Sequence, residues 1–158
     1  MNNNKYQLPF NLSKPTHFIA LGFGSGLAPK APGTFGTIAA IPLFLLLCNL
    51  TPFYYALVVL IICLVGVYVC GETARDIGVH DHGAIVWDEF AGFFITMFMV
   101  PVTWQSVFVG FILFRVLDIL KPWPISIADK KLSGGFGIMF DDILAGAIAL
   151  VIMHFIYL

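Results

Sequence analysis

The feature that most constrains the fold is the stretch from Phe53 to Cys70, which contains no charged side chain. As a helix it would be about 27 Å long at 1.5 Å per residue, close to the roughly 30 Å hydrocarbon thickness of a bilayer. The rest of the chain has the same character, since 59% of its residues are hydrophobic and only 11% are charged. Soluble domains are about 45–50% apolar and about 25% charged. The sequence therefore predicts an integral membrane protein.

Five apolar segments organise the chain, at residues 38–50, 53–70, 90–100, 104–119 and 143–158. The breaks at 51–52 and 101–103 are short and uncharged, which is typical of tight turns between helices. The other breaks, 71–89 and 120–142, are long and carry most of the charge. We therefore predict an all-α fold, a polytopic membrane helical bundle of about four to five hydrophobic helices. Residues 1–16 are expected to be a polar leader, and 17–158 a single membrane-embedded domain.

The basic residues fix the expected orientation of this bundle. If each apolar segment crosses once, residues 1–37, 71–89 and 120–142 lie on one side. All eight basic residues lie there or at its helix ends: Lys5, Lys14, Lys30, Arg75, Arg115, Lys121, Lys130 and Lys131. The positive-inside rule makes that side cytoplasmic and the chain multi-pass. The net charge of -1 offers no basic surface for nucleic acid, and the short spans make a homo-oligomer an open expectation.

Five acidic residues at the ends of apolar segments are the candidate metal ligands: Asp88, Glu89, Asp118, Asp141 and Asp142. Adjacent carboxylates about 4 Å apart repel by roughly 4 kcal/mol at an effective dielectric constant near 20, so a positive group must hold them. Hard oxygen ligands without a cysteine or histidine cluster favour Mg²⁺. Each acidic pair is followed by Ala-Gly, at Gly92 and at Gly146. Because small residues let membrane helices approach closely, we expect the two pairs to meet.

The candidate phosphate-binding residues come from three loops on the same predicted face. Arg115, Asp118 and Lys121 are spaced by three, which places them on roughly one face of a helix. Arginine suits bidentate contact with phosphate, and lysine supplies a point charge. Backbone N–H groups at helix starts and glycines also bind anions. The remaining candidates are Lys30 and Thr34, with Gly134 and Gly135 in the last loop.

Some of these residues have simpler interpretations. Asp88 or Asp142 would serve equally well as a helix N-terminal residue that stabilises the helix dipole. Arg115 and Asp118 would form an ordinary structural ion pair. Thr34 or Thr37 is expected to cap the helix that follows. The role of His82, which lies between Asp81 and Gly83, is left open between acid–base chemistry and support of the site.

Four blocks of this sequence resemble the phosphatidylglycerophosphatase A family, in the order of the family. They are LGFGSGLAP at 21–29 with APGTFGT at 31–37, DHGAIVWDEF at 81–90, FRVLDILKPWPI at 114–125, and GGFGIMFDD at 134–142. The resemblance implies a Mg²⁺-dependent phosphatase of the bacterial inner membrane that converts phosphatidylglycerophosphate to phosphatidylglycerol in phospholipid biosynthesis. Its active site would face the cytoplasm. The implied catalytic residues are Asp88, Glu89, Asp118, Lys121 and Asp142, with either water or an aspartate as the attacking group.

Two other classes of function remain as alternatives. A CDP-alcohol phosphotransferase also uses membrane-embedded acids and a divalent metal, but the Asp-Gly, Ala-Arg and late-aspartate spacing of that class is not found; Ala74-Arg75 is its only trace. A small ion transporter would place acids along an ion path. Against it, the acids gather at one face and no charge lies deep within an apolar segment.

Overall fold

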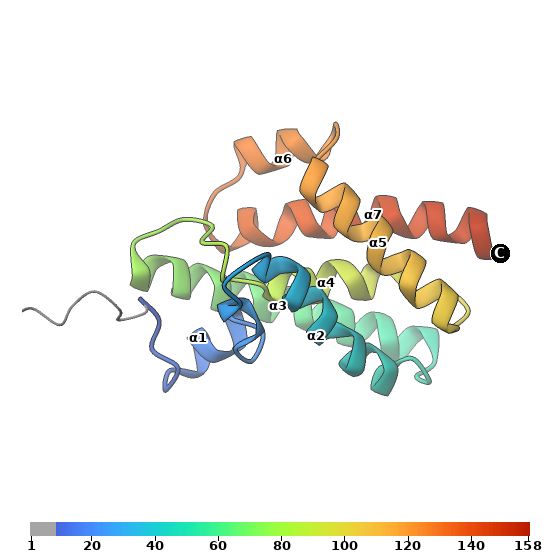
Figure 1. Ribbon diagram of the computed structural model, residues 1–158, viewed down its shortest axis with the longest axis horizontal. Helices are drawn as coiled ribbons and strands as arrows, with labels where there is room; N and C mark the ends of the chain where they lie inside the picture. The colour runs from blue at the N-terminus through green and yellow to red at the C-terminus, as the bar shows by residue number, and fades with distance from the viewer. Residues whose placement is uncertain (1–8) are drawn as a thin grey trace, which may run out of the picture.

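The computed structural model describes residues 9–158, and within this range every regular element is a helix. The elements in order are α1 (Pro15–Ala20), the short 3₁₀ helix η1 (Ser25–Leu27), α2 (Pro32–Leu47), α3 (Pro52–Ile77), α4 (Trp87–Thr96), α5 (Trp104–Leu120), α6 (Ile125–Lys131) and α7 (Gly134–Tyr157). Figure 1 shows the long helices arranged side by side as a bundle. The predicted all-α fold is confirmed.

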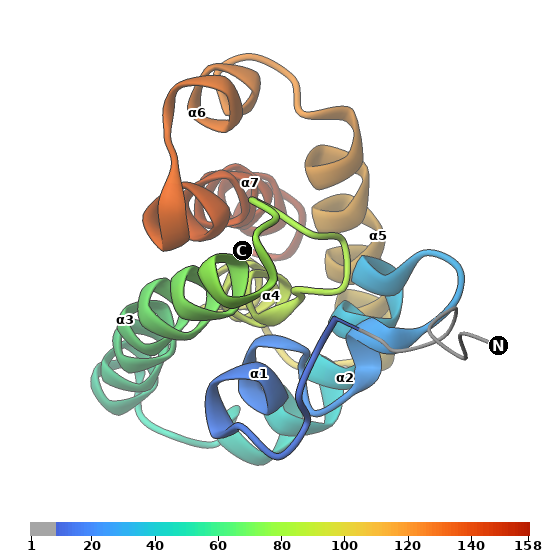
Figure 2. The same ribbon diagram turned by 90° about the vertical axis from the view of Figure 1, so that its left-hand side faces the viewer.

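Helix α4 is the centre of the bundle. It packs against α7, α3, α2 and α5, and Figure 2 shows it surrounded by other helices. Its side chains Phe90, Phe93 and Phe94 are fully enclosed, with at most 1% of their surface exposed. With 10 residues, α4 is about 15 Å long, which is too short to cross a bilayer by itself. The two acids in its first turn are consequently held inside protein.

Two helices, α3 and α7, are long and apolar enough to cross a membrane. Only 28% of the apolar window of α3 is buried within the bundle, and side chains such as Phe53, Leu60 and Leu64 are more than half exposed. A helix at the core of a soluble protein would bury such a face. The exposed apolar surface is therefore consistent with association with a membrane.

Two helix boundaries differ from the sequence-based expectation. The predicted loop 120–142 contains α6 and the first two turns of α7. The run of glycines suggested a loop because glycine disfavours helices, but here glycine is needed for packing: any side chain at Gly135 would overlap the carbonyl of Val67 in α3. Helix α2 begins at Pro32, so the expected capping role of Thr34 or Thr37 is wrong.

The described part of the predicted leader is bound to α3. Helix α1 begins at Pro15, and Lys14 Nζ and His17 Nε2 both lie 2.9 Å from Asp76 Oδ2 near the end of α3. His17 is buried. Residues 1–8 of the predicted leader, including Lys5, lie outside the described residues.

Candidate active site

The site is built where α4 crosses α7. A side chain at Gly92 would overlap Phe114, and one at Gly146 would overlap the backbone carbonyl of Gly92. The two glycines therefore allow the helix backbones to approach each other directly. Asp88 precedes Gly92 by one turn, and Asp142 precedes Gly146 by one turn, so the crossing brings both acidic pairs to one end of the bundle. The close approach expected from the two Ala-Gly pairs is confirmed.

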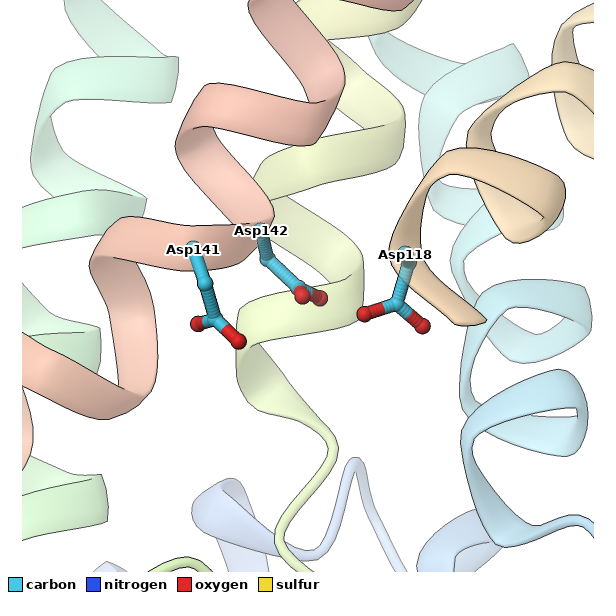
Figure 3. A group of neighbouring side chains, drawn as sticks. All are labelled: Asp118, Asp141 and Asp142. Carbon is cyan, nitrogen blue, oxygen red and sulfur yellow. The ribbon is translucent and has the colours of Figure 1, made fainter. Parts of the chain in front are cut away.

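Three aspartates form the most compact part of the site. Asp118 from the end of α5 and Asp141 and Asp142 from α7 each offer a carboxylate oxygen, and these oxygens lie within 4.8 Å of one another. Figure 3 shows the three side chains directed into one space beside α4. Asp141 and Asp142 are only 6% and 3% exposed. Among the described residues, Asp141 Oδ1 and Asp142 Oδ2 have no hydrogen-bond donor.

Unpartnered buried carboxylate oxygens are costly unless a cation or donor satisfies them. The donor set here is entirely carboxylate oxygen, which is what Mg²⁺ and other hard divalent cations prefer. The cluster therefore fits such a cation. The position of Asp142, well inside α7, also excludes the simpler interpretation that it caps a helix N-terminus.

Arg115 is the cation closest to the α4 side of the site. Its Nη1 group donates to Glu89 and, at 2.6 Å, to Asp118 Oδ2, so the simple ion pair with Asp118 is present but is shared with a second acid. The guanidinium side chain is 11% exposed, and its Nε atom has no acceptor among the described residues. Gly33 in the first turn of α2 lies against Glu89 and Arg115, where any side chain would overlap the Glu89 carboxylate.

Lys121 is the second cation of the site. Its Nζ lies 2.6 Å from Asp141 Oδ2 and is also paired with Asp129 of α6. Burial alone would lower the pKa of Lys121, but the hydrogen bonds to Asp129 and Asp141 outweigh it and hold the pKa above the ordinary value for lysine. Lys121 is therefore charged at neutral pH and can bind an anion next to the three aspartates.

Several predicted site residues do not belong to the three-aspartate cluster or to its two cations. Asp88 is buried and accepts a hydrogen bond from the Glu89 amide at 3.1 Å, outside the three-aspartate cluster. Lys30 is exposed and has no side-chain hydrogen bond or ion pair among the described residues. Thr34 is half-buried in the first turn of α2. His82 accepts from the Ala84 amide through Nδ1 and contacts Phe10.

The two glycines at the start of α7 have other partners. The Gly134 amide donates to His80 Nε2 at 2.8 Å, and Gly135 packs on α3. These contacts position the start of α7, the helix that carries Asp141 and Asp142. The expectation that they bind phosphate gains no support from this arrangement.

Two residues of the site were missed by the sequence analysis. Thr37 is buried in α2, and its hydroxyl lies 3.1 Å from Glu89 Oε2. Asp129 holds Lys121 from α6, a helix that was not predicted. One signal was available for Thr37: it lies one turn after Gly33, so in a helix that begins at Pro32 both face the same direction.

Known proteins share this sequence over most of its length. A family model described as Phosphatidylglycerophosphatase A matches residues 18–157. A protein named Phosphatidylglycerophosphatase A from Escherichia coli (strain K12) is 53% identical over 146 residues, which cover 92% of this chain and 85% of the relative. One of the same name from Haemophilus influenzae (strain Rd) is 46% identical over 155 residues, covering 97% and 95%. No solved structure is a significant match.

Proposed function

The chain belongs to the phosphatidylglycerophosphatase A family, and on this premise we propose that it hydrolyses phosphatidylglycerophosphate to phosphatidylglycerol and phosphate in phospholipid biosynthesis. The structural observation that carries the proposal is the cluster of Asp118, Asp141 and Asp142 between the cations Arg115 and Lys121. A terminal phosphate carries negative charge that both cations can bind. The acids alone would repel it, which is why a metal ion is part of the proposal.

We propose Mg²⁺ as the cofactor, held by Asp118, Asp141 and Asp142. The unpartnered oxygens of Asp141 and Asp142 support this assignment. When bound, Mg²⁺ would neutralise charge on the phosphate and favour the departure of the lipid oxygen. Asp88 and Glu89 stay candidate ligands, but Glu89 is already bound by Arg115 and Thr37. The structure therefore favours a positioning role for Glu89, holding the guanidinium in place.

The reaction itself is a displacement at phosphorus. Arg115 and Lys121 bind oxygens of the terminal phosphate and keep it oriented. Water attacks phosphorus in line with the bond to the lipid glycerol oxygen, and that bond breaks as the new one forms. Asp88, which is buried near the three aspartates, is a suitable acceptor for the proton lost by the attacking water, and solvent water returns a proton to the leaving glycerol oxygen. An aspartate of the cluster as the attacking group is the alternative.

The activity is tested with purified protein in detergent. We expect release of inorganic phosphate from phosphatidylglycerophosphate, and no transfer from CDP-diacylglycerol to an alcohol. Alcohol transfer without phosphate release would establish the CDP-alcohol alternative instead. In proteoliposomes, ion flux without phosphate release would indicate a transporter.

We also propose that the bundle crosses the bacterial inner membrane five times with the site at the cytoplasmic face. Figure 1 places the α2–α3 turn, the α4–α5 turn and the C-terminus at one end, while α1 and the loop after α3 lie at the other. Helix α4 does not need to match the bilayer thickness, because it is enclosed by protein. Helices α2 and α5 are about 25 Å long, which a locally thinned bilayer accommodates.

Cysteine labelling tests this topology. In a variant whose native Cys48, Cys63 and Cys70 are replaced by alanine, we expect Thr51→Cys to react with a membrane-impermeant maleimide in intact cells. Val79→Cys, at the opposite end of α3, is expected to react only after permeabilisation, because it lies on the cytoplasmic side. The reverse pattern, or reaction of both in intact cells, would contradict the proposed orientation.

A further inference from the structure

An apolar groove lies between α2 and α5, outside the residues assigned so far. Six of its lining side chains are Ile38, Ile41 and Leu45 from α2 and Trp104, Phe108 and Phe111 from α5. Figures 1 and 2 both show these two helices next to each other. The groove has a volume of about 630 Å³. This is within the range of about 300–1,000 Å³ that is typical of ligand sites.

On α5 the groove begins one helical turn from the active site. Ile38 follows Thr34 by one turn of α2, and Phe111 precedes Arg115 by one turn of α5. The two helices are held together at the site end, where Gly33 lies against Arg115. From Ile38 to Leu45 the groove continues for about 10 Å away from the site. A ligand whose phosphate is bound at Arg115 would therefore enter the groove about one helical turn below its headgroup.

The lining defines what the groove can hold. Trp104 and Phe108 are 76% and 59% exposed, and Ile38 and Leu45 are nearly half exposed, so the described residues leave much of the apolar wall uncovered. An occupant has to be apolar and elongated, and it has to emerge from a phosphate-bearing headgroup. We propose that this groove binds one acyl chain of the substrate lipid; the inference rests on the proposed function.

The benefit of such a groove is orientation. Lipid tails in the bilayer are as apolar as the groove, so moving a chain between them provides little hydrophobic driving force. Packing along Trp104 and Phe108 instead restricts the direction from which the headgroup reaches Arg115. We expect that restriction to favour the terminal phosphate over the inner phosphodiester at the three aspartates.

A photoreactive lipid tests the proposal without requiring turnover. The probe is phosphatidylglycerophosphate with a diazirine midway along one acyl chain, in vesicles of unlabelled phosphatidylcholine, with phosphatidylcholine carrying the same diazirine as the reference lipid. We expect the substrate probe to label peptides 38–45 and 104–111 about tenfold more than the reference lipid does, the margin expected of a modest binding preference. Ile41→Trp, which fills the groove, is expected to remove this excess. Leu60→Trp, on the exposed face of α3, is expected to preserve it.

The possible outcomes separate this inference from the proposed function. Equal labelling by both lipids would show that the groove is an ordinary lipid-facing surface. If neither lipid labels the groove because a second copy of the chain covers it, the groove is an interface between subunits. Either result overturns the inference. So does labelling confined to the smaller hollow of about 280 Å³ near Val116 and Ile156. Selective labelling of the groove without phosphate release would support the lipid site and contradict the phosphatase function. Phosphate release without selective labelling would support the phosphatase function and contradict the lipid site.

Discussion

Replacing Asp142 with asparagine is expected to lower the rate of phosphate release from phosphatidylglycerophosphate by about a thousandfold, comparable to removing a principal electrostatic group from an active site. Asparagine preserves the size of the side chain and one oxygen, but it removes a negative charge from the proposed Mg²⁺ site. Asp142 is 3% exposed, and one of its carboxylate oxygens has no donor among the described residues. The rate constant at saturating substrate and Mg²⁺ is the quantity to measure.

The control for this variant is Asp76→Asn, which also neutralises an acid but lies in the contact with Lys14 and His17. It is expected to keep most of the activity. Thermal unfolding distinguishes loss of chemistry from loss of fold: without metal, Asp142→Asn should be at least as stable as the original chain, because one of three mutually repelling carboxylates is gone. An Asp142→Asn protein that is folded and fully active would remove this residue from the mechanism.

Arg115→Lys is expected to lower kcat/KM by about a hundredfold, although the charge is retained. Arginine presents a planar fork of donors, and here one arm is held by Glu89 and Asp118 while Nε is free of any described acceptor. The shorter ammonium group of lysine cannot contact both acids and a phosphate oxygen in the same geometry. Lysine is chosen because it keeps a positive charge next to the buried Glu89. A neutral residue would leave that carboxylate without a cation and would destabilise the fold.

Arg75→Lys is the matched control, because Arg75 is also an arginine paired with an acid three residues away, Glu72. Its side chain is 75% exposed on the surface of α3, so the change is expected to leave kcat/KM unaltered. If Arg115→Lys and Arg75→Lys behaved alike in phosphate release, the guanidinium of Arg115 would not be a phosphate ligand. A loss confined to KM would assign Arg115 to lipid binding rather than to the displacement step.

The sequence was sufficient to predict the apolar helices and the close approach of the two helices that carry the acidic pairs. Apolar segments without charges have few alternatives to helices in a membrane, and small residues such as Gly92 and Gly146 indicate where two helices can touch. The lack of charge and the small residues are both local features, so they can be identified in a single sequence. Asp118, Asp141 and Asp142 belong to the predicted set of five acidic ligands, which was chosen because all five lie at the ends of apolar segments.

Other parts of the site depend on contacts between distant residues. Gly134 and Gly135 resembled a phosphate-binding loop, because their local preference opposes a helix, but packing of Gly135 on Val67 decides their conformation. Thr37 was expected to be a cap, and its bond to Glu89 appears only when α2 begins at Pro32. Asp129, which pairs with Lys121, lies in α6, and a helix of seven residues is too short for a hydrophobic pattern to predict it.

The most direct test of the central claim is the dependence of phosphate release on Mg²⁺. Purified protein is stripped of metal with a chelator, and release from phosphatidylglycerophosphate is followed while free Mg²⁺ is restored. The clustered carboxylates of Asp118, Asp141 and Asp142 predict that activity is lost in the chelator and returns with Mg²⁺ along a saturable curve. Full activity of the metal-free protein, unchanged by added Mg²⁺, would contradict the account.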